Sequence, residues 1–94
     1  MNNVDFKSLI ASAERAKQDQ TVIEWDVCDI IDSIIAQLKL IEQNPDCYFS
    51  KAVRRSIIDS MPWDIPFFNE LMNFLGEHDK YHKALAKLKK KEIK

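Results

Sequence analysis

Glycine and proline are scarce in this chain of 94 residues, which contains one glycine and three prolines: Gly76, Pro45, Pro62 and Pro66. Folds rich in β-strands need turn residues at intervals of roughly 8–12 positions. The chain does not contain enough of them to connect a sheet of many strands. The sequence therefore predicts an all-α fold.

Cysteine is also scarce, since only Cys28 and Cys47 occur. Two isolated cysteines do not make the disulfide framework of a small secreted protein. No apolar run reaches the roughly 18–20 residues of a membrane-spanning helix, and no apolar signal segment follows Met1. We expect a cytoplasmic protein with free thiols and no membrane partner.

Motifs that carry catalysis are missing from the sequence. It has no glycine-rich phosphate-binding loop, no G-x-S-x-G nucleophile elbow and no cysteine–histidine arrangement of defined spacing. These absences remove the positive case for an enzyme. We expect a protein without catalytic activity and without a cofactor.

Charge is nearly balanced over the whole chain, with a formal net charge of −1, but it is unevenly distributed. Residues 21–43 carry five acids and one lysine, whereas residues 77–94 carry seven lysines and three acids. The length suits a single domain. We predict one helical domain over residues 1–94, with a lysine-rich end, residues 87–94, that is open to fraying.

Hydrophobic periodicity predicts four helices, at about residues 5–17, 22–43, 46–61 and 65–91. The second is expected to begin at a capping box formed by Thr21 and Glu24. The third is expected to begin at Asn44 and Pro45, because proline is favourable at the first helical position. The last helix is expected to continue through Gly76, because the register is undisturbed there, and a kink at Gly76 is the alternative.

The two long predicted helices each carry an apolar seam whose positions step by four and three residues. The seams are Val27, Ile31, Ile34, Leu38 and Ile41 in the second helix, and Phe67, Leu71, Phe74, His78, Tyr81, Leu85 and Leu88 in the last. Such seams pack along other helices. We predict a compact antiparallel bundle of about four helices, with the two long helices packed antiparallel at its centre.

The segment GEHDKYHKAL places His78 and His82 four residues apart, the spacing of the two zinc ligands in an H-E-x-x-H helix. However, Asp79 stands where that motif has glutamate, and no third ligand follows at a set distance. Cys28 and Cys47 are each isolated, so a Cys2His2 site is poorly supported. His78 and His82 are weak metal candidates, and we expect them to serve in packing.

The two tryptophans are candidates for contact with a partner protein, because tryptophan is enriched among interface anchors. On a continuous helix over residues 22–43, Trp25, Asp29 and Asp32 share a strip opposite the apolar seam. The alternative is that Trp25 lies under the first helix or a loop. Trp63 lies in a proline-stiffened corner, MPWDIP, where it either plugs one end of the bundle, the commoner arrangement, or is presented to a partner.

Lysines in the last predicted helix form a stripe opposite Leu85 and Leu88: Lys83, Lys87, Lys90 and Lys94. With Arg54 and Arg55 they could follow the phosphates of a nucleic acid. The stripe has no arginine and no loop of base-reading polar residues beside it. Lysine also favours the C-terminal end of a helix dipole, so a solvated face is the simpler interpretation.

These features favour a small non-enzymatic protein-binding module that contacts a partner protein, or a second copy of itself, through Trp25, Asp29, Asp32 and Trp63. Short helical chains without catalytic motifs are typical of inhibitors, regulators or adaptors encoded by phages or mobile elements, including anti-defence and immunity-like proteins. The alternative hypothesis is a nucleic-acid-binding accessory protein that uses the lysine stripe.

Overall fold

The structure, a computed structural model, describes residues 5–92 of the chain. Five helices follow one another: α1 (Phe6–Ala16), α2 (Gln20–Trp25), α3 (Cys28–Gln43), α4 (Lys51–Ser60) and α5 (Pro66–Glu92). Turns and loops join them, and no strand occurs within the described range. The prediction of an all-α fold is confirmed.

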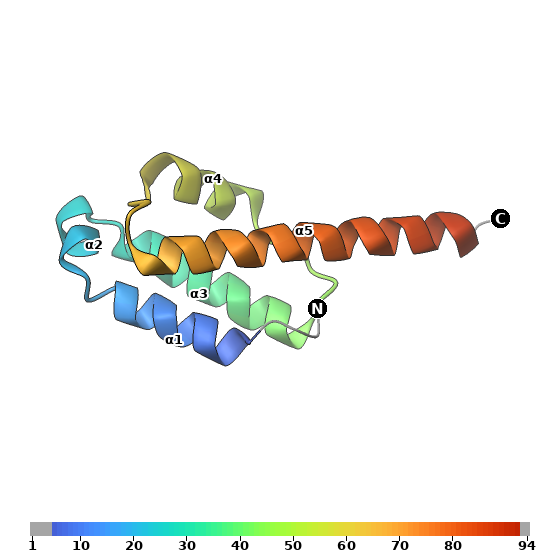
Figure 1. Ribbon diagram of the computed structural model, residues 1–94, viewed down its shortest axis with the longest axis horizontal. Helices are drawn as coiled ribbons and strands as arrows, with labels where there is room; N and C mark the ends of the chain where they lie inside the picture. Colours follow the sequence, from blue (N-terminus) through green and yellow to red (C-terminus); the bar gives the residue numbers. More distant parts are fainter. Residues whose placement is uncertain (1–4, 93–94) are drawn as a thin grey trace.

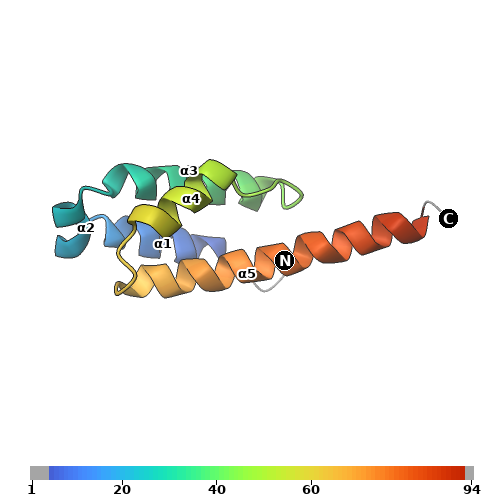
Figure 2. The same cartoon turned by 90° about the horizontal axis from the view of Figure 1, so that it is seen from above.

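The helices form a bundle in which neighbours in contact run antiparallel. α1 packs against both α3 and α5, and α4 packs against α3. Figures 1 and 2 show that α3 and α5 run in the same direction along the long axis. The expected antiparallel pairing of the two long helices is therefore wrong. The chain reverses once before α4 and once after it, so α5 starts at the same end of the molecule as α3.

The core is built from the predicted seams. The five residues of the first seam, which comprise the N-cap of α3 and four residues of that helix, are at most 4% exposed: Val27, Ile31, Ile34, Leu38 and Ile41. Phe74 of α5 joins three parts of the chain, because its ring meets Phe6 of α1 edge-on at 5.6 Å and Phe49 at 6.5 Å. The α5 seam is buried as far as His78 and is 56% exposed at Leu88. The last turns of α5 therefore lie outside the core.

The predicted helix 22–43 is broken at Asp26, which adopts a left-handed conformation (φ 56°) and ends α2. At about 100° per residue, Val22 and Ile31 would lie on opposite sides of one continuous helix. Both side chains are fully buried here, and the break makes this possible. The predicted capping box at Thr21 is also wrong, because Asp19 caps α2 by accepting a hydrogen bond from the Thr21 amide (2.9 Å).

The third predicted helix begins at Lys51 rather than near residue 46, so Asn44 and Pro45 do not start it. Ser50 is the N-cap, and its hydroxyl accepts a hydrogen bond from the amide of Val53 (3.3 Å). Residues 44–50 instead form a loop that buries Phe49 in the core. The loop also contacts α5, where Tyr81 and His82 lie within hydrogen-bond distance of Asp46 and Cys47.

α5 continues through Gly76 as a single helix of 27 residues. The molecule measures 53 × 24 × 19 Å, and its length comes from the end of α5, which projects past the other four helices (Figures 1 and 2). None of the described helices has an apolar stretch long enough to cross a lipid bilayer. α5 extends to Glu92, within the lysine-rich segment, whereas residues 93 and 94 lie outside the described range.

Candidate functional site

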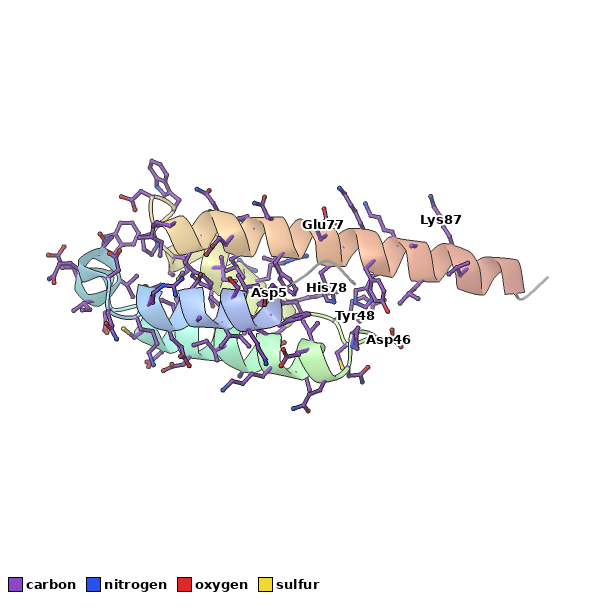
Figure 3. The ribbon with its side chains drawn as sticks, turned by 60° about the horizontal axis from the view of Figure 1, so that its bottom comes forward. Asp5, Asp46, Tyr48, Glu77, His78 and Lys87 are labelled. Atoms are coloured by element: carbon purple, nitrogen blue, oxygen red, sulfur yellow. The ribbon has the colours of Figure 1, made fainter. Side chains whose placement is uncertain are left out.

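The histidine motif of α5 holds the loop that connects α3 and α4. His78 is 2% exposed and its ring stacks on Phe74 at 5.6 Å. The half-buried His82 stacks against Tyr48 of the loop, with ring centroids 4.0 Å apart. Figure 3 shows His78 on the side of α5 that faces Tyr48 and the loop. We call the contacts of His78, Tyr81 and His82 with residues 46–48 the histidine clasp.

The Nε2 atoms of His78 and His82 are 3.0 Å apart, so one of them must carry a hydrogen and the other must accept it. Nε2 of His82 also lies 3.2 Å from the carbonyl oxygen of Cys47. A carbonyl only accepts, so His82 Nε2 carries the hydrogen, and this single N–H is shared between the carbonyl oxygen of Cys47 and Nε2 of His78. His78 then accepts through Nε2 and is held in its neutral form.

The pKa of His78 is lowered from 6.5, first because burial disfavours the imidazolium and second because of the charge of His82. The carbonyl groups of Pro45 and Cys47 and the carboxylate of Asp79 oppose this shift. Two adjacent imidazolium ions would repel one another at the observed separation. The lowered pKa of His78 therefore agrees with the neutral form that its hydrogen bond to His82 requires.

Two more hydrogen-bonded contacts hold α5 in this region, one within the histidine clasp and one to α4. The hydroxyl of Tyr81 donates to Asp46 of the loop (3.1 Å), and this hydrogen bond raises the pKa of Tyr81. Nη2 of Arg54 in α4 donates to both carboxylate oxygens of Asp79 (3.0 and 3.1 Å). Residues 78–82 of α5 therefore act mainly to join this helix to the loop and to α4.

The histidine clasp does not complete a metal site. Among the residues that the structure describes, no three histidine, cysteine, aspartate or glutamate side chains come close enough to hold an ion. Cys28 and Cys47 are free thiols, and Cys28 Sγ lies 3.7 Å from the carbonyl oxygen of Lys17. These cysteines do not complete a Cys2His2 set with His78 and His82.

Both tryptophans are exposed at the same end of the molecule. Trp25 is 51% exposed at the end of α2, and Trp63 is 73% exposed in the corner between α4 and α5. Figures 1 and 2 place α2 and this corner at the end opposite to the free end of α5. The expectation that Trp63 plugs the bundle is wrong, because Met61, Pro62 and Ile65 fill the corner instead.

Two isoleucines are also exposed in the elements at this end: Ile23 in α2 (52% exposed) and Ile58 in the last turn of α4 (69% exposed). We call Ile23, Trp25, Ile58 and Trp63 the aromatic end. Neither isoleucine was predicted to be exposed. For Ile58 the signal was its position next to Ile57 on a short helix, because adjacent helical residues point about 100° apart and Ile57 is fully buried.

The strip that was expected to join Trp25, Asp29 and Asp32 does not exist as one helical face, because the break at Asp26 places Trp25 on a different helix. Asp29 and Asp32 are both exposed on α3. Asp32 is engaged by Lys17, whose Nζ lies 2.6 Å from Oδ1, and this hydrogen bond raises the pKa of Lys17. Asp29 lies near the start of α3, closer to the aromatic end.

A shallow hollow of about 210 Å³ opens between the end of α1 and the start of α5. Polar and apolar groups line it, including Arg15, Asp19 and Ile65. Its residues adjoin α2 and the corner that carries Trp63. The hollow therefore belongs to the same end of the molecule as the two tryptophans.

The basic candidates are divided between paired and exposed side chains. Arg54 is paired with Asp79, and Arg55 lies 3.6 Å from Asp59. Lys83 and Lys87 are exposed on the projecting part of α5, and Figure 3 shows Lys87 pointing away from the bundle. Lys90 lies in α5 at a position whose side chain is not described, and Lys94 lies outside the described residues. The two arginines therefore do not extend the lysine stripe as free charges.

Comparison of the chain with models of known protein families, with curated protein sequences and with solved structures finds no match.

Proposed function

We propose that the chain is a small, non-enzymatic protein-binding module that contacts its partner through the aromatic end. The observation that carries this proposal is the exposure of both tryptophans, 51% for Trp25 and 73% for Trp63, at one end of the bundle. Scattered exposed apolar residues are ordinary, but large apolar side chains gathered in one region typically mark an interaction surface. Tryptophan is also among the residues that most often dominate binding energy.

Carboxylates surround the aromatic end and indicate the character of the partner. Glu24, Asp26, Asp29 and Asp64 are exposed and lie in or next to α2 and the corner. Residues 18–38 contain five acids and no lysine or arginine. Complementary charge accelerates encounter and selects the orientation of docking. The proposed partner is therefore a protein with a basic surface around an apolar patch.

The cellular role that we propose is that of an inhibitor, regulator or adaptor, of the type encoded by phages or mobile elements. The small size of the chain and the lack of catalytic motifs in its sequence support this role. The free thiols of Cys28 and Cys47 support a place in the reducing cytoplasm. Such a module would act by covering a surface of its target.

Substituting Trp63→Ala is expected to abolish capture of the partner from a lysate of the native host, because the indole supplies the largest exposed apolar contact. The free energy of unfolding should change by less than about 1 kcal/mol, as for other surface substitutions. Capture is measured by affinity purification and mass spectrometry, and stability by urea unfolding.

The matched control for this experiment is Tyr48→Ala, which removes a similarly exposed aromatic side chain (75%) from the loop of the histidine clasp. This variant should retain the partner. Equal capture by the Trp63→Ala and wild-type proteins would refute the proposed surface. Unfolding of the Trp63→Ala protein would show instead that Trp63 supports the core.

The second candidate function is nucleic-acid binding by the projecting end of α5, where Lys83 and Lys87 are exposed. One helix face with lysines and no aromatic platform offers phosphate contacts but no base recognition. Shift assays at two salt concentrations test it, because binding through phosphates must weaken steeply as salt rises. The aromatic end plays no part in this alternative.

A further inference from the structure

The molecule carries opposite charges at its two ends. Residues 18–38 and 59–70, which include α2 and the corner of the aromatic end, contain eight acids. Two of them are paired with basic residues of α1 and α4, Asp32 with Lys17 and Asp59 with Arg55, so within the described residues most of the acids at this end remain outside an ion pair. Residues 80–91 contain six lysines and no acid. α2 and the corner lie at one end of a molecule 53 Å long, and the end of α5 lies at the other (Figure 1).

The basic end of α5 extends past the other helices that the structure describes. We call residues 83–92 of α5 the tail. Both ribbon views show the tail projecting beyond the other helices. Leu88 is 56% exposed and Leu85 is half-buried, on the face opposite Lys83 and Lys87. Leu88 is largely unburied within the described part of the chain, so a surface that covers the two leucines would stabilise the tail by removing apolar area from water.

We propose that two copies of the chain pack side by side and antiparallel, so that the tail of each covers the aromatic end of the other. Leu85 and Leu88 would meet the apolar surface formed by Trp63 and Ile58, and the lysines would lie near the surrounding carboxylates. The two contacts are equivalent under one two-fold axis, so the assembly closes as a dimer.

Charge favours this arrangement over a contact between two tails. Two tails side by side would bring like charges together, which opposes association. Antiparallel copies place each basic tail against an acidic end. The attraction also acts before contact, over a Debye length of about 10 Å at 0.1 M salt. The dimer should therefore form most readily at low ionic strength.

Self-association would regulate the proposed partner-binding surface, and this consequence rests on the proposed function. A tail seated on the aromatic end covers the surface that a partner would need. The partner must then compete with the tail of a second copy. The tail is a basic helix with an apolar stripe. A partner protein that binds the aromatic end would carry a similar surface, with basic side chains around an apolar patch.

Analytical ultracentrifugation of the full chain tests the dimer. We expect a monomer–dimer equilibrium at low salt that shifts to monomer as salt is raised. Leu88→Asp and Trp63→Ala should each weaken self-association by about tenfold or more. Leu40→Asp, at an exposed leucine (47%) on α3 outside both surfaces, should leave the dimer intact.

Mixing the two variants identifies the contact. Leu88→Asp retains a complete aromatic end, and Trp63→Ala retains a complete tail, so the mixture should form a heterodimer through one intact contact. Two variants that fail alone but associate together would support the proposal directly. Circular dichroism of each variant checks that the helices are retained.

Three results would overturn the dimer. One is a monomer at every protein concentration at low salt. Another is a dimer that is lost in Leu88→Asp but unaffected in Trp63→Ala, which would indicate contact between tails. The third is an increase in mass only after an RNA or DNA oligonucleotide is added.

The dimer and the proposed function can fail separately. A monomeric chain that still captures a partner through Trp63 would refute the dimer alone. A chain that dimerises but whose monomer captures no partner would refute the proposed function alone.

Discussion

Leu38→Ala is expected to lower the free energy of unfolding by about 2–5 kcal/mol, the usual cost of removing a fully buried leucine side chain. Leu38 has no exposed surface and lies in the middle of the α3 seam. The substitution removes apolar contacts and leaves a cavity that the surrounding helices only partly fill. Because a small domain has about 5–15 kcal/mol of total stability, the loss should be evident in a urea unfolding curve.

The matched control is Leu40→Ala, the same substitution two positions further along the same helix. Leu40 is 47% exposed, so its loss should change stability by about 0.5 kcal/mol or less. The difference between the unfolding free energies of the two variants shows which face of α3 is buried. Equal effects would mean that the seam does not face the core, and the bundle would be wrong.

Acidification is expected to destabilise the protein as pH falls below about 6.5, through His78. The pKa of this histidine is lowered in the folded state by burial and by the neighbouring His82. The unfolded chain therefore takes up the proton at a higher pH than the folded chain does. Stability is fully present above the unfolded pKa of about 6.5 and is lost progressively toward the lower folded pKa.

Urea midpoints measured across this pH range test the effect, with His78→Gln as the comparison. Glutamine keeps a neutral hydrogen-bonding group but cannot take up the proton. The variant should show a flatter dependence on pH, whatever its absolute stability. Parallel curves for the two proteins would contradict a neutral, buried His78 and with it the geometry of the histidine clasp.

The apolar seams could be predicted from the sequence because they repeat at the helical period. Leu38 and Leu71 are fully buried, as the spacing indicates. The same pattern predicted a long last helix that continues through Gly76 or kinks there, and α5 is continuous. Periodicity is a reliable guide here because each seam has many members and tolerates one irregular position.

The breaks between helices could not be predicted, because contacts between distant residues decide them. α2 ends at Asp26, and this break allows Val22 to be buried. The local sequence indicates a helix start at Thr21 and does not indicate an end at Asp26. The loop 44–50 remains non-helical because His82 and Tyr81 bind it from α5, more than 30 positions away. Local propensity at Asn44 and Pro45 does not contain that information.

The candidate site was predicted in its residues but not in its geometry. Trp25 and Trp63 were both identified as possible contact residues, yet their shared position at one end depends on the path of α4 and the corner that follows it. Asp32 was predicted to share a contact strip with Trp25, but it pairs with Lys17 instead. The sequence pattern did not indicate this pair because the two residues are 15 positions apart. Sequence patterns identify candidate residues, but only the packed chain shows which of them lie together.

Quenching of tryptophan fluorescence by acrylamide tests the central claim most directly, since Trp25 and Trp63 are the only tryptophans in the chain. The measurement is made on dilute protein at high salt, where self-association is weakest. If both indoles lie outside the core, the folded protein should be quenched almost as efficiently as the protein in denaturant. Blue-shifted emission that resists quenching until the chain unfolds would place the tryptophans in the core and contradict the proposed binding surface.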